Sequence, residues 1–104
     1  MDKREALIIA KVYIDSISSR YNIKDAILFG SFAKGTNHKD SDIDIAIVIN
    51  NFVDIIDTQI EMMKLRRKID LRIEPHPFMI DDFNQSNPVV NEIIKFGIPI
   101  NNIN

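Results

Sequence analysis

One segment constrains the fold of this chain more than any other. Residues 42–49 read Asp-Ile-Asp-Ile-Ala-Ile-Val-Ile, and polar and apolar side chains alternate at its start with the two-residue period of a β-strand. After Asp44 both faces of the strand are apolar, which is typical of a strand that is covered on both sides. The segment therefore predicts a central strand in a sheet with helices packed on its faces.

The sequence around this strand predicts the remaining elements. Helical spacing of apolar residues predicts helices at about Lys3–Tyr21, Val53–Lys68, Ile80–Phe83 and Val89–Phe96, with a short helix beginning at Ser31. Short apolar runs predict further strands at Asp25–Phe29 and Ile69–Glu74, the second stopped by Pro75 and Pro77. We expect a small mixed β-sheet flanked by helices, an α/β or α+β fold.

The second long helix has a defined expected start and core face. Asn50 or Asn51 can cap its N-terminus through a side-chain oxygen. Its apolar residues recur at helical spacing, which predicts one face packed against the sheet. The expected core residues are Phe52, Ile56, Ile60 and Met63.

Length and composition narrow the classes of function. With 104 residues we expect a single domain spanning 1–104. A net charge of −2, from 13 basic and 15 acidic residues, argues against a protein whose main task is coating nucleic acid. No cysteine is present, so disulfides and thiolate metal sites are excluded and a cytoplasmic location is expected. No apolar run approaches the roughly 18 residues of a membrane span.

A glycine-rich turn follows the strand predicted to end at Phe29. Its sequence from Gly30 to Gly35 is Gly-Ser-Phe-Ala-Lys-Gly. Gly30 allows a sharp turn and a close approach to a ligand, and a helix opening at Ser31 would direct free N–H groups outward. Such a helix start is suited to binding a triphosphate, so this turn is a candidate phosphate loop.

Two carboxylates open the central strand. Asp42 and Asp44 are alternate residues, so both side chains project from one face. Two carboxylates so close repel unless a cation lies between them, and Mg²⁺ prefers carboxylate and phosphate oxygens. A two-metal site needs a third carboxylate. We expect Asp70 in that role, with Glu74 in reserve because Pro75 places it at the exit end of the predicted strand.

These residues resemble a known signature. Gly30-Ser31, ten further residues and then Asp42-Ile43-Asp44 are similar to the motif of the DNA polymerase β-like nucleotidyltransferase superfamily. The form Gly-Ser-Phe-Ala-Lys-Gly with Ser-Asp-Ile-Asp resembles its minimal nucleotidyltransferase (MNT) branch. The resemblance covers roughly residues 27–73 and continues more weakly to residue 100.

The resemblance implies roles for individual residues. Asp42 and Asp44 would bind two Mg²⁺ ions, for which Mn²⁺ is also suited, and Asp70 would bind the metal at the acceptor hydroxyl. The triphosphate of ATP would be bound at Gly30 and Ser31. The remaining expected nucleotide-binding residues are Lys34, Gly35 and Ser41. Lys34 departs from the arginine of many relatives and would meet a phosphate without bidentate geometry.

The resemblance also implies an acceptor. MNT proteins of this length resemble the antitoxins of HEPN–MNT toxin–antitoxin pairs, in which AMP passes from ATP to a tyrosine of the HEPN ribonuclease toxin. A hetero-oligomer with such a toxin is then expected. Two alternatives stay open: a non-catalytic nucleotide-binding module that neutralises its partner by occlusion, and a small-molecule nucleotidyltransferase whose acceptor subunit is separate.

Several features have simpler structural interpretations. Asp70 could form an ion pair with Arg72, and His38 and His76 are expected in loops. Met62 and Met63 are expected to fill the core. The basic run consists of Lys64, Arg66, Arg67 and Lys68, and cations of this kind suit a helix C-terminus.

Overall fold

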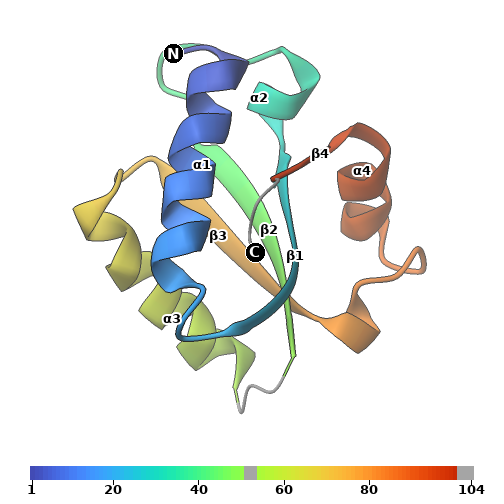
Figure 1. Cartoon of the computed structure of the whole chain (residues 1–104). Coiled ribbons are helices and arrows are strands. Elements are labelled where there is room, and N and C mark those ends of the chain that lie inside the picture. Colours follow the sequence, from blue (N-terminus) through green and yellow to red (C-terminus); the bar gives the residue numbers. More distant parts are fainter. Residues whose placement is uncertain (51–53, 101–104) are drawn as a thin grey trace.

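A four-stranded mixed sheet with helices on both faces forms the domain (Figure 1). The computed structural model describes residues 1–50 and 54–100. In chain order the elements are α1 (Lys3–Ile17), β1 (Asn22–Phe29), α2 (Ser31–Lys34), β2 (Ile43–Asn50), α3 (Ile55–Leu65), the 3₁₀ turn η1 (Arg66–Lys68), β3 (Ile73–Met79), the 3₁₀ turn η2 (Ile80–Asp82), α4 (Pro88–Phe96) and β4 (Ile98–Pro99). The expected α+β fold with a small mixed sheet is confirmed.

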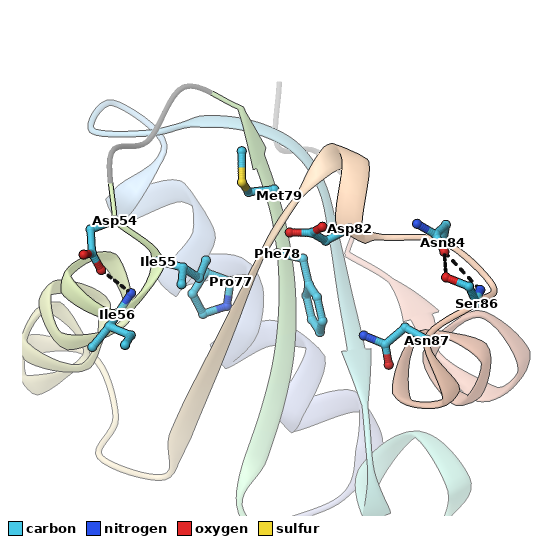
Figure 2. A pocket seen from close by; sticks show the side chains of 10 residues that line it. All are labelled: Asp54, Ile55, Ile56, Pro77, Phe78, Met79, Asp82, Asn84, Ser86 and Asn87. Carbon is cyan, nitrogen blue, oxygen red and sulfur yellow. Dashed lines mark hydrogen bonds between the residues drawn. The ribbon is translucent and has the colours of Figure 1, made fainter.

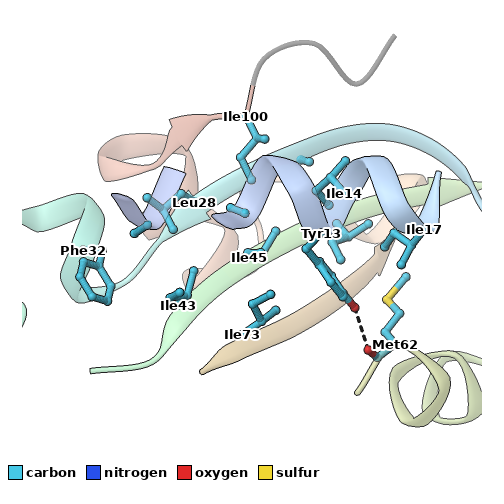
Figure 3. Close-up of a cluster of buried hydrophobic side chains, with 14 of the residues drawn as sticks. Tyr13, Ile14, Ile17, Leu28, Phe32, Ile43, Ile45, Met62, Ile73 and Ile100 are labelled. Carbon is cyan, nitrogen blue, oxygen red and sulfur yellow. Dashed lines mark hydrogen bonds between the residues drawn. The ribbon is translucent and has the colours of Figure 1, made fainter. Parts of the chain in front are cut away.

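The strand order is β3-β2-β1-β4, so β2 is an interior strand, as its sequence predicted. It pairs antiparallel with β1 and parallel with β3. Its odd-numbered isoleucines join the larger core with α1 and α3, and Figure 3 shows Ile43 and Ile45 among them. On the opposite face Ala46 packs with Ile27 of β1 and Ile93 of α4. Both faces of β2 are therefore covered, and its polar start is left at one end of the sheet.

Helix α1 begins where predicted and ends earlier. Asp2 caps it, because its carboxylate accepts a hydrogen bond from the Glu5 N–H at 2.9 Å. The buried face repeats at helical spacing and packs on β2. The helix ends at Ile17 instead of Tyr21, because the Arg20 N–H donates to the Ile17 carbonyl in a closing turn.

The predicted core face of α3 is wrong. Ile56 and Ile60 are 66% and 49% exposed, and Met63 is only half-buried, whereas Thr58 and Met62 are buried. Tyr13 explains the rotation, since its buried hydroxyl donates a hydrogen bond of 2.8 Å to the Met62 carbonyl (Figure 3). This contact turns the Thr58–Met62 side of α3 toward α1. Phe52, the fourth predicted core residue, lies outside the described residues.

The cap of α3 also differs from the prediction. Asp54 caps the helix, and its carboxylate accepts from the N–H groups of Ile56 and Asp57. Asn50 is instead the last residue of β2, and Asn51 lies outside the described residues. Because Asp54 is an equally good cap residue, the helix starts at Ile55, two residues later than predicted.

The third strand was misplaced. It runs over Ile73–Met79 and includes both prolines that were expected to stop it. Ile69 and Asp70 instead donate their N–H groups to the Arg66 carbonyl, which extends the turn after α3. β3 is an edge strand that pairs only with β2, and proline is tolerated there because one edge needs no N–H donor. His76 consequently lies in a strand and not, as predicted, in a loop.

No helix in residues 1–50 and 54–100 has the length and apolar character needed to cross a membrane.

Candidate functional site

The turn after β1 contacts the carboxylate of Asp44. β1 ends at Phe29, which lies opposite Asp44 in the ladder, and Gly30 follows with φ of +74°. A Cβ atom on Gly30 would lie 2.4 Å from Asp44 Oδ2 and 3.2 Å from its Cγ. A side chain here would therefore collide with the carboxylate and strain the backbone. The glycine turn and the central strand thus form one site.

The turn continues into a single helical turn. α2 spans Ser31–Lys34, and Gly35 ends it in the left-handed conformation with φ of +75°. Phe32 and Ala33 are buried and anchor the turn in the core. The first N–H groups of such a helix lack intrahelical partners. The turn therefore presents backbone donors beside Asp44, as a phosphate loop would.

Asp42 and Asp44 flank the start of β2. Asp42 precedes the strand and is exposed, whereas the Asp44 side chain is 25% exposed. Buried Ile43 between them anchors the strand, and buried Ser41 precedes the pair. The Ser41 hydroxyl accepts the His38 N–H at 2.9 Å and so fixes the loop. The two carboxylates supply the accessible oxygens that Mg²⁺ prefers, so these residues fit a divalent metal.

His76 is the nearest polar partner of Asp44. Its Nε2 lies 3.1 Å from Asp44 Oδ1, and its ring meets Phe29 edge-on with centroids 5.0 Å apart. Asp44 thus has a different neighbour at each oxygen, His76 at Oδ1 and the Gly30 backbone at Oδ2. The turn after β1 and the strand β3 therefore border this carboxylate on opposite sides.

The two candidates for a third carboxylate lie differently. Asp70 precedes β3 and bonds Arg72, with Nη2 to Oδ2 at 2.7 Å and Nε to Oδ1 at 2.9 Å. Hydrogen bonds from Arg72 hold the pKa of Asp70 below its usual value. Glu74 is in parallel register with Asp44, and Arg66 Nη1 lies 3.7 Å from its Oε2. Register, not sequence, brings Glu74 beside Asp44.

The structure does not bring the three predicted metal ligands together. Asp70 forms the ion pair with Arg72 that was its simpler interpretation. Within the described ranges, no three acidic, histidine or cysteine side chains form a metal-binding cluster, and this holds for Glu74 with Asp44 and His76 as well as for Asp70. The metal roles of Asp70 and Glu74 therefore both remain predictions.

Lys34 makes its contacts with α4. Its ammonium forms an ion pair with Glu92 and lies 5.1 Å from the centroid of the Phe96 ring. The lysine therefore ties the glycine turn to α4. To meet a phosphate, its side chain would have to exchange Glu92 for the ligand.

A large groove lies away from this site. A groove of about 830 Å³ runs between the start of α3 and the segment after β3 (Figure 2). Phe78 and Met79 line it, and they pair with Val48 and Ile49 near the C-terminal end of β2. Asp44 lies near the other end of that strand. The acidic residues that line the groove are Asp54 and Asp82. The Asp54 carboxylate already accepts hydrogen bonds as the N-cap of α3. The contact between Gly30 and Asp44, not cavity size, identifies the candidate site.

Sequence comparison places the chain in a family. The family described as Polymerase beta, Nucleotidyltransferase matches residues 13–104, and the chain belongs to it. The resemblance to the polymerase β-like nucleotidyltransferases is thereby confirmed. No curated protein matches the sequence of this chain.

Three solved structures share the fold. One, from Sulfolobus solfataricus and described as a candidate nucleotidyltransferase, has 21% identity and a TM-score of 0.66, with 93% of this chain and 80% of that chain covered. A toxin–antitoxin with AMP-PNP has 23% identity and a TM-score of 0.61, with 88% and 71% covered. A mutant of the toxin–antitoxin MntA-HpeT has 20% identity and a TM-score of 0.54, with 96% and 73% covered.

Sequence reasoning missed His76, although a signal was present. Glu74 and His76 are alternate residues, which is the spacing of side chains on one face of a strand. Pro75 between them and Pro77 after them concealed that period, because proline is read as a strand breaker. The misplaced strand therefore hid both the histidine and the register of Glu74.

Proposed function

We propose that this chain transfers AMP from ATP to a hydroxyl group. The observation that carries the proposal is the contact between Gly30 and Asp44, which joins a phosphate loop to a carboxylate pair. In the reaction the acceptor oxygen bonds to the α-phosphorus, the bond to the β-phosphate oxygen breaks, and pyrophosphate leaves. The acceptor's proton passes to a base.

The predicted carboxylate pair and the predicted nucleotide-binding residues each have a place in this scheme. Asp42 and Asp44 would hold Mg²⁺, or Mn²⁺, whose charge when bound offsets that of the phosphates. Gly30 and Ser31 would hold the triphosphate through backbone donors. Ser41 positions the loop before Asp42. Lys34 and Gly35 shape the far end of the turn, and Lys34 reaches a phosphate only after leaving Glu92.

A third carboxylate would complete the metal site. Asp70 was the residue predicted from the sequence, but its carboxylate is bound to Arg72. Glu74 is the acid in register with Asp44, and its distance of 3.7 Å from Arg66 leaves a looser pairing. We therefore favour Glu74 over Asp70 as the third ligand.

The proposed acceptor is a tyrosine hydroxyl of a HEPN ribonuclease toxin, with this chain as the antitoxin in the cytoplasm. What supports this is the MNT-like motif together with a fold shared with two toxin–antitoxin structures. The competing functions are neutralisation by occlusion and transfer to a small molecule. They differ in what happens to the partner's mass, so one experiment separates them.

The test mixes the purified chain with ATP, Mg²⁺ and the protein encoded by the neighbouring gene, and measures the intact mass of both chains. We expect one added AMP on the partner. Asp44→Asn should slow this transfer about a thousandfold, corresponding to about 4 kcal/mol, since a metal ligand is lost. Asp25→Asn is the control, because this exposed aspartate of β1 lies outside the site.

The outcomes are distinct. If the partner gains no mass but is still neutralised by Asp44→Asn, the protein acts by occlusion. If neither chain gains mass while ATP is consumed with a small hydroxyl compound, the acceptor is a small molecule. Either result would overturn AMP transfer to a protein.

A further inference from the structure

Helix α3 presents an apolar stripe to solvent. Ile56, Ile60 and Met63 recur at helical spacing, and the rotation set by Tyr13 leaves the first two 66% and 49% exposed. In Figure 2, Ile55 faces Pro77 of β3 while Ile56 lies on another side of the helix. The stripe is therefore the outer face of α3 and not part of the core.

This stripe is the floor of a groove. A hollow of about 450 Å³ lies between α3 and the outer edge of β3, with Gln59 and Glu74 also lining it. The Gln59 amide donates to the Pro75 carbonyl at 3.3 Å and helps to join helix and strand. β3 is an edge strand, and its prolines lack N–H groups for adding another strand. Side chains, not backbone pairing, would recognise a ligand here.

Cations form one end of the groove. Lys64, Arg66 and Arg67 line it. Arg66 already has a hydrogen-bond partner within the chain, because its Nη1 donates to the Ile73 carbonyl at 2.8 Å. Lys64 and Arg67 make no ion pair with any residue of 1–50 or 54–100. On a chain of net charge −2, this end is locally positive and would attract carboxylates.

One residue links the groove to the candidate site. Glu74 lines the groove, and its backbone pairs with Asp44 on the neighbouring strand. A protein that covers the groove would therefore contact the strand next to the one that carries Asp44. The other apolar hollow, beside Ile8 and Lys11 on α1, lacks this continuity, because Ile98 and Ile100 at the β4 edge of the sheet border it.

We propose that the α3–β3 groove is the docking surface for the acceptor protein, and that it receives an amphipathic segment with apolar side chains followed by carboxylates. This inference rests on the proposed function in taking the acceptor to be a protein. The apolar floor favours a protein over nucleic acid, because the groove offers no aromatic side chain on which bases could stack.

The experiment measures binding separately from transfer. The probe is the protein encoded by the neighbouring gene, and its affinity is measured by calorimetry for the wild-type chain, Ile60→Ser, Arg67→Glu and Val89→Ser. Val89 is the matched control, since it is 53% exposed on α4, away from the groove. We expect Ile60→Ser to weaken binding at least about tenfold. Arg67→Glu should weaken binding and reduce its salt dependence, and Val89→Ser should leave it unchanged.

Three results with the probe would overturn the docking surface, and a fourth concerns nucleic acid. These are no complex with the probe, equal effects of Ile60→Ser and Val89→Ser, or a dimer of this chain that Ile60→Ser dissociates without changing probe affinity. A short single-stranded oligonucleotide bound through Arg67 and not Ile60 would assign the groove to nucleic acid and also overturn it. Circular dichroism confirms that each variant is folded.

The proposed function and the docking surface can fail separately. If the wild-type complex forms and depends on Ile60 but no AMP is transferred, the docking surface stands and AMP transfer fails. If AMP is transferred at limiting acceptor equally well by Ile60→Ser, AMP transfer stands and the docking surface fails.

Discussion

The segment from β1 to β2 and the segment from α3 to β3 border the same candidate site but are built differently. The first lies in the interior of the sheet, where Gly30 is fixed against Asp44 and β2 is covered on both faces. The second ends in an edge strand beside an exposed helix face. The comparison suggests a division of roles: the interior holds the reacting groups still, and the edge leaves room for a partner. Each experiment below tests one side of this division.

After the loss of Asp44 itself, the largest effect is expected in the interior, at Gly30. In Gly30→Ala the new Cβ would lie 2.4 Å from Asp44 Oδ2, and a side chain would be held at φ of +74°. The left-handed backbone costs about 1–3 kcal/mol of stability, and Asp44 must move. We expect transfer to fall about 100- to 1000-fold, measured as the initial rate of AMP incorporation, with stability measured by urea unfolding.

Gly35→Ala is the control at the other end of the turn. Gly35 has nearly the same φ, +75°, but its ψ of 19° lies in the left-handed helical region, whereas Gly30 has ψ of −150°, and a Cβ on Gly35 meets nothing within 4 Å. Gly35→Ala should lose about 1–2 kcal/mol of stability through the backbone alone, while transfer changes less than about threefold. Equal losses of transfer in the two variants would show that backbone strain, and not contact with Asp44, explains the requirement for Gly30.

The interior segment could be predicted because its requirements are local. A backbone with positive φ beside a carboxylate favours glycine, so the glycine at position 30 was enough to predict a turn there. Alternation from Asp42 onward places both carboxylates at the start of a buried strand without knowledge of its neighbours. What the sequence did not contain is the distance from Gly30 to Asp44, which depends on how β1 and β2 pair.

An intermediate effect should separate the two acids near β3. Glu74→Gln should lower transfer about 100-fold, because it removes a carboxylate in register with Asp44. Asp70→Asn should lower transfer less than about threefold, because the Asp70 carboxylate already accepts a hydrogen bond from Arg72. Initial rates at saturating ATP and Mg²⁺ check both. The reverse order would restore Asp70 as the third ligand.

The pH dependence of thermal stability tests the structural role of Asp70. Its pKa is lowered by hydrogen bonds from Arg72, so its stabilising contribution is present above the ordinary carboxyl pKa and is lost as pH falls through the lowered value. Wild-type protein should therefore lose this contribution on acidification, whereas Asp70→Asn lacks it throughout. Thermal midpoints of the two proteins should differ at neutral pH and converge in acid.

The structure of the segment from α3 to β3 was not predicted correctly, because contacts with neighbouring elements determine it. Pro75 and Pro77 are poor strand residues in isolation and acceptable only because β3 is an edge strand. The stripe at Ile56 and Ile60 has the spacing of a core face, and only the contact between Tyr13 and Met62 shows that another side of α3 is buried. Both errors come from long-range packing, which periodicity does not contain.

Apart from the variants expected to change transfer less than about threefold, the smallest effect is expected at His76, where the edge strand meets the interior of the sheet. His76 contacts Asp44 Oδ1 from β3 without being a predicted metal ligand. Loss of a group that orients a ligand typically weakens metal binding by about 10- to 100-fold. We expect His76→Ala to lie near the lower limit, about tenfold, because the Gly30 backbone still crowds Oδ2. Calorimetric titration with Mn²⁺ and a non-hydrolysable ATP analogue measures this affinity.

His76→Gln distinguishes orientation from packing. The glutamine amide can donate a hydrogen bond from a position close to that of Nε2, but it loses the ring that meets Phe29 edge-on. Recovery of Mn²⁺ affinity in His76→Gln would show that the hydrogen bond to Asp44 matters. If His76→Gln behaves like His76→Ala, ring packing on Phe29 is what holds β3 against the interior. β3 would then support the site only by packing against Phe29. The hydrogen bond between His76 and Asp44 would not matter, and the edge strand and the interior would have separate roles.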